Sequence, residues 1–329
     1  MSSVSKFFFG VAVFSLLALS LGPAKAAEYP DKPITLVSPY GPGGAADLAA
    51  RTVASTASTY LGQPLLVVNK TGAAGVTGSF YVVRSKPNGY TLLLARVGSQ
   101  AGVPAINPNI PYKWDQYTML GLLERNPFVL VVNGKSDIKT FADFEKALKD
   151  GKKLSYGSAG VGTLLHIAAM VMADSMGVDP KQLRHIPYKG GGKARAAIVG
   201  GHVDFMWQNL SGVIGAIESG QLRALAVTTD KRVDSIKDVP TVAELKYPRM
   251  ETIIGWSAIY GPPKLPEPVV TKWVDTLGKL KTDKAWVKFT KQLGSIPDIR
   301  SPAETKAFVE NQYTTFKEVV TKLGITIGK

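Results

Sequence analysis

The stretch Ile34-Thr35-Leu36-Val37-Ser38-Pro39-Tyr40-Gly41-Pro42-Gly43-Gly44-Ala45-Ala46-Asp47 joins a short apolar run to a glycine-rich turn and the start of a helix. Residues 34–37 predict a buried strand, and the pattern that follows predicts a helix over about 47–60. Glycines let the backbone approach a ligand closely, and free amides at a helix start favour an anion. The stretch therefore predicts an α/β protein with an anion-binding turn.

A second glycine-rich turn has the same arrangement: Tyr156-Gly157-Ser158-Ala159-Gly160-Val161-Gly162-Thr163-Leu164-Leu165-His166. A strand is expected to end at 154–157 and a helix to run over 162–175. Backbone amides and two small hydroxyls at such a turn make an anion nest. His166, about one turn into the helix, either orients the turn or packs without a ligand role. Two such turns suggest one ligand held between two lobes.

Other interpretations of these turns lack a required residue. Gly41, Gly43 and Ala46 have the spacing of a dinucleotide-binding turn, but residues 48–114 contain no Asp or Glu to hold a ribose hydroxyl. A serine-hydrolase elbow needs glycine where Tyr156 stands, and no triad follows from the spacing. A phosphate loop needs a closing Gly-Lys-Ser/Thr, which is absent.

The rest of the chain alternates apolar strands with helices. Strands are expected near 65–68 and 90–95, and the alternation starts again near 128. Past Pro262-Pro263 the chain is expected to be helical, and capping boxes are expected at Thr140–Asp143 and Ser301–Glu304. This pattern predicts two α/β lobes, each a mostly parallel sheet flanked by helices, with breaks near 125–130 and 250–260.

Polar residues that follow other expected strands are directed at the same crevice. Arg96 follows the buried run 92–95, and Gln208 follows the strand expected over 203–207. Each candidate has a plainer alternative, such as a solvated side chain for Lys189 and a helix cap for Asp47. The candidate ligand-binding residues are Tyr40, Pro42, Gly43, Gly44, Ala45, Asp47, Arg96, Ser158, Ala159, Gly160, Gly162, Thr163, His166, Tyr188, Lys189, Asp204 and Gln208.

Composition narrows the function further. The 329 residues include no cysteine and three histidines, which excludes disulfides and thiolate metal sites and leaves little for a histidine metal centre. Lys and Arg outnumber Asp and Glu by 39 to 25, a formal charge of +14, yet no basic run is longer than two. We therefore expect no metal, no cofactor and no nucleic-acid partner, but a small anion as ligand.

The first 26 residues have the pattern of an export signal. Lys6 precedes an apolar stretch of about sixteen residues, and Ala24-Lys25-Ala26 supplies small residues at the cleavage positions. The stretch is short for a membrane anchor, and Gly22-Pro23 breaks it at once. We expect cleavage near Ala26 and export of the mature protein.

Several short motifs follow one another in a set order along the mature chain. They are PYGPGGAAD with AR (39–47 and 50–51), LGQP with VNK (61–64 and 68–70), PNGYTL (87–92), the 156–163 turn with His166, PYKG (187–190), GHVD (201–204) and DVPTVAE (238–244). Together they resemble the Bug-type solute-binding proteins of tripartite tricarboxylate transporters. The resemblance covers essentially the whole mature chain.

This resemblance implies a two-lobed periplasmic binding protein of the Venus-flytrap type, with residues 27–127 and 254–329 in lobe 1 and 128–253 in lobe 2. It implies a monomeric receptor, not an enzyme, that closes on a small carboxylate and delivers it to membrane permease subunits. In the family, backbone amides and bridging waters hold the carboxylate, which maps onto Tyr40 to Ala45 and Ser158 to Thr163. The acid could be aliphatic or aromatic.

The chain departs from the family pattern at four places. Tyr40 stands where phenylalanine is usual, and Ala45-Ala46 replaces Gly-Thr. Arg96 replaces a small residue, and Gln208 stands where an acid is frequent. Together the last two disfavour an amino-acid ligand and favour a second anionic group. Two other functions stay open: an exported hydrolase that cleaves a small anionic ester through Ser158, and a ligand-sensing accessory to a membrane kinase.

Overall fold

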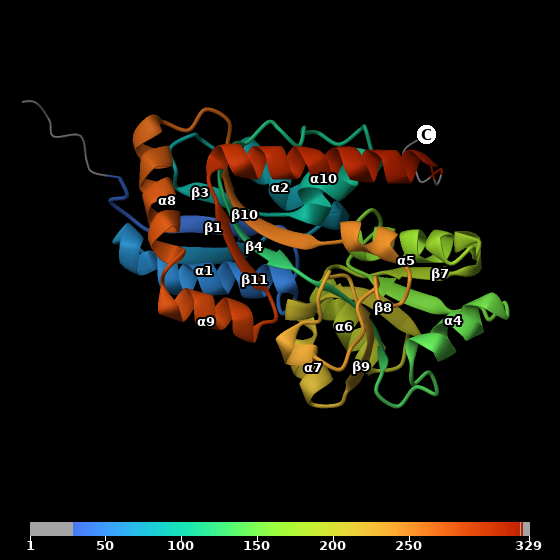
Figure 1. Ribbon diagram of the computed structural model, residues 1–329. Coiled ribbons are helices and arrows are strands. Elements are labelled where there is room, and N and C mark those ends of the chain that lie inside the picture. Colours follow the sequence, from blue (N-terminus) through green and yellow to red (C-terminus); the bar gives the residue numbers. More distant parts are fainter. Residues whose placement is uncertain (1–28, 323, 325–329) are drawn as a thin grey trace, which may run out of the picture.

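The computed structural model describes residues 29–322 and residue 324, which form two β-sheets flanked by helices (Figure 1). The predicted signal segment, residues 1–26, lies outside the described residues. Among the described residues, no helix is long and apolar enough to cross a membrane.

The larger sheet has six strands in the order β11-β4-β10-β3-β1-β2. The strands β2, β1 and β3 are parallel, whereas β3, β10, β4 and β11 alternate in direction. The strands are β1 (Ile34–Ser38), β2 (Leu65–Asn69), β3 (Thr91–Arg96), β4 (Thr118–Asn126), β10 (Gly255–Gly261) and β11 (Ile296–Arg300).

The smaller sheet has five strands in the order β7-β6-β8-β5-β9. Here β6 is parallel to β7 and β8, and β5 is antiparallel to β8 and β9. The strands are β5 (Phe128–Asn133), β6 (Ser155–Ser158), β7 (Arg184–Pro187), β8 (Phe205–Asn209) and β9 (Leu222–Val227).

Two chain crossings join the sheets. Only Pro127 separates the end of β4 from the start of β5, and the chain returns through residues 228–254 to β10. The chain leaves the larger sheet at the end of β4 and re-enters it at the start of β10, and the two strands are antiparallel. The expected two-lobed α/β fold is confirmed, but both sheets are mixed and not mostly parallel.

Helices cover both faces of the six-stranded sheet. Alternate residues of β3 point to opposite faces: Leu92 and Leu94 pack in one apolar cluster, and Leu93 and Ala95 in another. The first cluster contains side chains of α1 (Ala45–Leu61), α8 (Glu267–Leu280) and α9 (Lys284–Gln292). The second contains side chains of α2 (Val76–Val83) and α10 (Pro302–Lys322), as Figure 1 shows.

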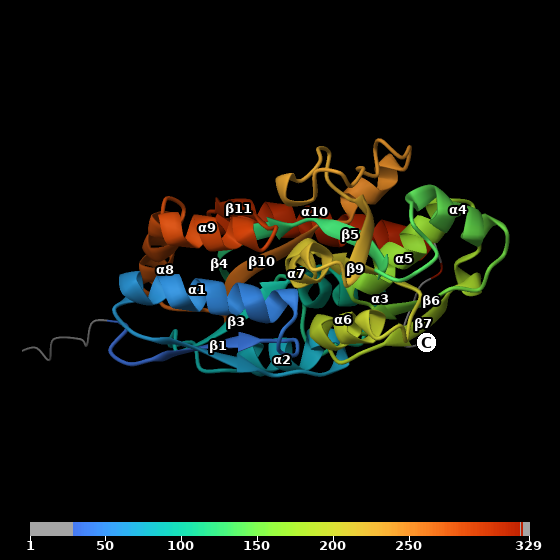
Figure 2. The same ribbon diagram turned by 90° about the horizontal axis from the view of Figure 1, so that it is seen from below.

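The second cluster continues without a break into the five-stranded lobe. It includes Leu130 of β5, Phe205 of β8 and Trp256 of β10, all fully buried. The lobes therefore share packed surface. Figure 2 shows the two groups of elements next to each other, seen from below. The helices of this lobe are α4 (Phe141–Lys149), α5 (Leu164–Ser175), α6 (Gly191–Val199) and α7 (Ile214–Glu218).

Short helical segments connect other elements of both lobes. They are η1 (Ala73–Gly75), η2 (Gly98–Gly102), α3 (Val103–Ile106), η3 (Pro180–Gln182), η4 (Leu210–Gly212), η5 (Asp234–Ile236) and η6 (Pro248–Thr252).

The capping boxes predicted from the sequence are confirmed. The Asp143 amide donates to Thr140 Oγ1, while the Asp143 carboxylate accepts from the Thr140 amide. Ser301 and Glu304 make the same exchange at the start of α10. The expectation that the chain is helical past 262–263 is wrong in part, because β11 pairs with β4 between α9 and α10.

Candidate functional site

A cavity lies between the two lobes, among the carboxyl ends of their strands. About 420 Å³ of space between its walls is free of protein atoms, part of it open to solvent. Its walls are Tyr40, Gly44, Ala45, Ala46, Arg96, Val97, Gly98, Phe128, Ala159, Thr163, Leu164, Leu165, Gly191, Gln208 and Asn209.

Two helices begin at this cavity, one from each lobe. The first residues of α1, Ala45 and Ala46, and of α5, Leu164 and Leu165, line it. Neither helix has a side chain that accepts from its first-turn amides. First-turn N–H groups have no partner within their helix and carry the positive end of its dipole. An anion between the lobes would receive amides from both helices.

Arg96 is buried in the cavity wall at the end of β3. Strand register places it beside Ser257 of β10, and Ser257 in turn beside Glu124 of β4. The guanidinium donates to Ser257 Oγ, and its Nη1 lies 3.7 Å from Glu124 Oε1. Ser257 Oγ also donates to Glu124 Oε1 at 2.7 Å. The positive charge of Arg96 is therefore balanced inside lobe 1.

Arg96 also reaches across to the other lobe. Its Nη2 donates to Asn209 Oδ1 at 3.0 Å, and Asn209 ends β8. Burial lowers the pKa of Arg96, and the Glu124 carboxylate opposes that shift. Arginine keeps its charge in proteins in any case. Arg96 has five N–H bonds, so donors remain for a ligand beside Ser257 and Asn209.

Two neutral polar side chains complete the wall. Gln208 Oε1 accepts from the Asn209 amide at 2.9 Å, and Gln208 Nε2 donates to the Gly191 carbonyl at 3.3 Å. The Tyr40 hydroxyl donates to the Ala74 carbonyl at 2.9 Å. Burial raises the pKa of Tyr40 well above its ordinary value, so it stays a neutral hydrogen-bond group.

Asp47 holds the first glycine turn in shape. One of its carboxylate oxygens accepts from the Gly43 amide and from Arg51 Nε, both at 3.0 Å, and the other accepts from Asn69 Nδ2 at 2.9 Å. Burial raises the pKa of Asp47, but the hydrogen bonds from Arg51, Gly43 and Asn69 outweigh burial and leave the pKa below its ordinary value. Asp47 supports the turn and does not line the cavity.

Two histidines support the second glycine turn from behind. His166 Nδ1 accepts from the Gly162 amide at 3.2 Å, so that nitrogen carries no proton. His185 Nε2 lies 2.6 Å from Ser158 Oγ, and the two imidazoles stack with ring centres 4.3 Å apart. Burial lowers the pKa of each to about 4. The turn is therefore built on neutral histidines.

This pair makes stability depend on pH. Both histidines have a folded-state pKa near 4 against an ordinary value of 6.5, so between these values the unfolded chain binds more protons. The free energy of unfolding should therefore fall as pH falls from about 6.5 to about 4. Urea unfolding at a series of pH values measures this, and His185→Phe, which keeps a stacking ring, should flatten the slope. An unchanged slope in that variant would contradict the assignment.

Glycine backbones from the two lobes meet beside the cavity. A methyl group at Gly192 would lie 2.5 Å from the Pro42 carbonyl oxygen, and one at Gly44 would lie 3.1 Å from the Gly192 amide. A methyl at Gly190 would lie 2.9 Å from the Gly41 amide. We call these facing segments, residues 41–44 and 190–192, the glycine clasp. Only glycine allows the lobes to approach this closely.

Seven of the residues predicted from the sequence line the cavity: Tyr40, Gly44, Ala45, Arg96, Ala159, Thr163 and Gln208. The others do not. Ser158 and His166 lie behind the second turn, Lys189 is exposed, and Asp204 accepts from the amide and hydroxyl of Ser155. The remaining ones shape the turns: Pro42, Gly43, Gly160, Gly162 and Tyr188, the last of which packs beside Gly157.

Sequence reasoning missed several wall residues: Ala46, Val97, Gly98, Phe128, Leu164 and Leu165. Leu164 and Leu165 could have been found, because they hold the first helical positions after the second turn. Phe128 could not, since it reads as an ordinary core residue. Over the described residues, no group of three or more His, Cys, Asp or Glu side chains could hold a metal ion.

Comparisons with known proteins agree with this geometry. The model of the tripartite tricarboxylate transporter family receptor matches residues 49–325. The protein BugT of Bordetella pertussis is 30% identical over 317 residues, which cover 95% of this chain and 96% of BugT. Two solved structures of Rhodopseudomonas palustris proteins are also similar.

MatC with bound malate is 25% identical, with a TM-score of 0.83 over 89% of this chain and 100% of MatC. Rpa4515 with adipate is 26% identical, with a TM-score of 0.86 over 91% of this chain and 99% of Rpa4515. The matched family is one of solute-binding receptors, which are not enzymes. The chain belongs to the tripartite tricarboxylate transporter receptor family, as the Bug-type motifs predicted.

Proposed function

We propose that this receptor captures a small carboxylate between its lobes in the periplasm and delivers it, as a monomer, to the membrane subunits of a tripartite transporter. The observation that carries the proposal is the pair of uncapped helix N-termini, one from each lobe, at a single cavity. A carboxylate can accept from both, so it would hold the lobes together. Malate and adipate, bound by the two R. palustris relatives, are carboxylates of suitable size.

The lobes would be residues 27–127 with 254–329, and residues 128–253. Supporting this division, β4 passes into β5 at Pro127, and the chain re-enters the larger sheet at Gly255. Opening would bend the chain at these two crossings, as in other hinged binding proteins. Residues 1–26 would direct export and be removed near Ala26.

The ligand would carry a second anionic or hydrogen-bonding group at Arg96. Arg96, Asn209 and Gln208 all line the cavity, and the Arg96 guanidinium donates to Asn209. None of these three side chains carries a negative charge that could bind a ligand ammonium group. In the described chain, the one carboxylate within ion-pair distance of Arg96 is Glu124, which Arg96 already neutralises. An amino acid would therefore find no free carboxylate for its ammonium group, whereas a dicarboxylate would find donors for both ends.

The hydrolase alternative meets a chemical obstacle as well as the family assignment. Ser158 and His185 are within hydrogen-bond distance, but Ser158 is completely buried and does not line the cavity. The pKa of His185, lowered to about 4 by burial, makes it a weak general base. The pair therefore serves the shape of the turn.

A thermal-shift screen of carboxylates tests the proposed function. The panel should include malate, adipate, aromatic acids, matched monocarboxylates and amino acids. A ligand at one hundred times its dissociation constant should stabilise the protein by about 2.7 kcal/mol. The largest shift is expected for a dicarboxylate and none for amino acids. No shift with any carboxylate would overturn the proposal.

A further inference from the structure

We propose that the exposed face formed by β2 and α2 is the surface on which an acidic, extended segment of the membrane transporter docks when the lobes are closed; this rests on the proposed delivery function. We call it the β2–α2 face and define it by Leu66, Val68, Lys70, Tyr81 and Arg84. Three of these are large hydrophobic side chains left in solvent: Leu66 is 51%, Tyr81 47% and Val68 39% exposed.

The exposed side chains belong together because of strand register. Thr91 of β3 pairs with Thr35 of β1, which pairs with Leu66 of β2, so the three side chains share one face of the sheet. Val68 lies two residues farther along the same face. α2 covers this face over β1 and β3 and leaves β2 uncovered, so the apolar row continues outward from the core.

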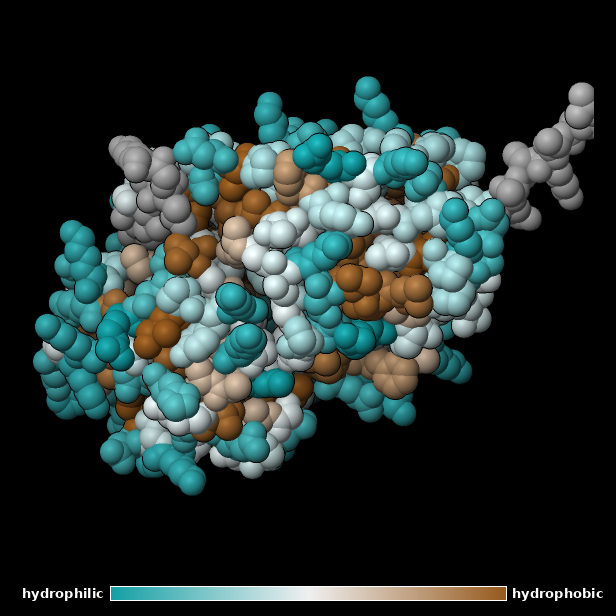
Figure 3. Space-filling view, turned by 180° about the vertical axis from the view of Figure 1, so that it is seen from behind, coloured by the Kyte–Doolittle hydropathy of each residue, from teal (hydrophilic) through white to brown (hydrophobic). Residues whose placement is uncertain are grey.

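A groove runs along α2 beside this row. The groove is open to solvent, and its walls include Phe80, Tyr81, Arg84, Lys86 and Tyr90. Figure 3 shows this side of the molecule, with apolar surface among hydrophilic side chains. A concave surface of this kind fits a chain segment better than a flat bilayer, which decides between a protein and a membrane partner.

The charge of the face specifies an acidic partner. Lys70 Nζ lies 4.2 Å from the centre of the Tyr81 ring, Arg84 lies over Phe80, and Lys32 over Tyr90. The carboxylate of Asp31, near the groove, accepts a hydrogen bond from the Tyr90 hydroxyl. Residues 48–114, which include β2 and α2, contain no Asp or Glu. The excess of cations complements carboxylates on the partner.

The edge position specifies an extended segment. β2 is the last strand of its sheet, with β1 as its one neighbour. A strand at an edge leaves backbone groups on its outer side that can pair with another extended chain, while the side chains beside it select the sequence. The acidic segment would therefore run along β2 and place apolar residues on Leu66 and Val68.

The face also adjoins the contact that forms on closure. The chain leaves β2 through Lys70 and reaches Ala74, which packs on Gly160 of the other lobe: a methyl group at Gly160 would lie 3.3 Å from Ala74 Cβ. Val161, the next residue, is 42% exposed. A partner that bound the β2–α2 face and reached Val161 would contact both lobes, so its docking would depend on closure and follow ligand capture.

The test is receptor-dependent uptake of radiolabelled malate, or adipate if the thermal-shift panel selects it, in cells whose own copy is replaced by each variant. The variant Leu66→Glu/Val68→Glu should reduce uptake at least tenfold while the purified protein binds the same acid with unchanged affinity. The matched control is Phe289→Glu, because Phe289 is 44% exposed but lies on α9. Charge reversal by Lys70→Glu/Arg84→Glu should reduce uptake as well.

Each contrary outcome would overturn a distinct part of the docking proposal. Uptake equal to wild type in Leu66→Glu/Val68→Glu would refute the docking surface, and normal uptake after charge reversal would refute the acidic partner. If wild type bound phosphatidylglycerol vesicles and Leu66→Glu/Val68→Glu did not, the face would be assigned to the membrane instead. Failure of the wild-type receptor to support uptake, or to bind any carboxylate, would remove the proposed function itself.

Discussion

Gly192→Ala is expected to weaken carboxylate binding by about thirtyfold, equivalent to about 2 kcal/mol, because it obstructs closure of the lobes. The added methyl group would lie 2.5 Å from the Pro42 carbonyl oxygen and 3.2 Å from the Gly44 amide nitrogen, both in the other lobe. Backbone on both sides of the contact cannot move aside as a side chain can. Titration calorimetry with the best acid of the panel gives the affinity.

The substitution can be separated from a folding defect. Gly192 lies in the first turn of α6 and has no left-handed backbone, so alanine fits its conformation. Gly215→Ala is the matched control, since Gly215 lies on α7 of the same lobe and a methyl group there meets nothing within 4 Å. The control should bind normally. Scattering should show Gly192→Ala remaining open with ligand; full closure and full affinity would contradict the role of the glycine clasp.

Removal of the buried charge pair should change which acids bind. Arg96→Met alone would leave Glu124 buried without its cation, a loss of about 3–5 kcal/mol in the free energy of unfolding that confuses any binding result. In Arg96→Met/Glu124→Gln both charges are gone, and Ser257 can still donate to the amide at position 124. We expect this double variant to bind a dicarboxylate at least tenfold more weakly, with little change for the matched monocarboxylate.

The comparison between the dicarboxylate and the matched monocarboxylate shows which role Arg96 has. If Arg96 serves only to tie β3 to Asn209 across the cleft, both acids lose affinity equally, because closure is what suffers. If it holds the second carboxylate, only the dicarboxylate loses. The single variant Glu124→Gln frees the Arg96 charge and should strengthen dicarboxylate binding. Because it also leaves a buried charge unpaired, its free energy of unfolding has to be measured alongside. Equal losses for both acids would reject the second anionic site.

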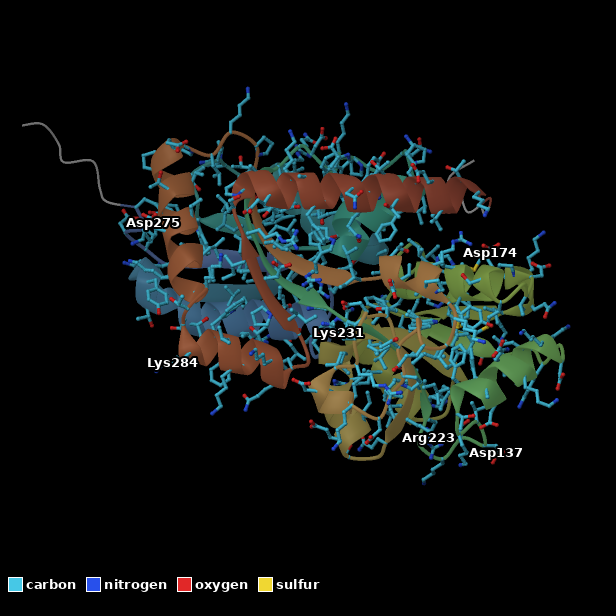
Figure 4. The ribbon with its side chains drawn as sticks, viewed as in Figure 1. Asp137, Asp174, Arg223, Lys231, Asp275 and Lys284 are labelled. Carbon is cyan, nitrogen blue, oxygen red and sulfur yellow. The ribbon has the colours of Figure 1, made fainter. Side chains whose placement is uncertain are left out.

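The exposed charged residues are not expected to affect either of these two binding results. Asp275 and Lys284, labelled in Figure 4, lie on the outer helices α8 and α9, and both are exposed. Exposed charges of this kind contribute only about 0–1 kcal/mol even where they form ion pairs. Arg96 and Glu124 differ because they are buried between strands, where an unpaired charge has no water to solvate it.

Local chemistry explains what could be predicted from the sequence. A glycine turn between an apolar run and a helix has few stable conformations, so the segments at 34–47 and 156–166 were expected as anion sites, and both helices do begin at the cavity. The strands β4, β10 and β11 were missed. Their partners are far away in sequence, and Gly255 to Gly261 carries no local pattern that distinguishes it from a loop.

The sequence by itself determined the α/β class, the two-lobe organisation, the family and the two glycine turns, because each depends on contacts between near neighbours or on motifs read in order. Only the tertiary structure decided the function of single side chains. Arg96 was expected to favour a second anionic group on the ligand, but the sequence did not show that strand register places Glu124 beside its partner Ser257 and balances the charge. Likewise, Gly192 matters because the backbone of Pro42 faces it across the cleft. The contacts of Ser257 with Arg96 and Glu124, and of Gly192 with Pro42, join residues more than a hundred positions apart, and only the folded chain brings them together.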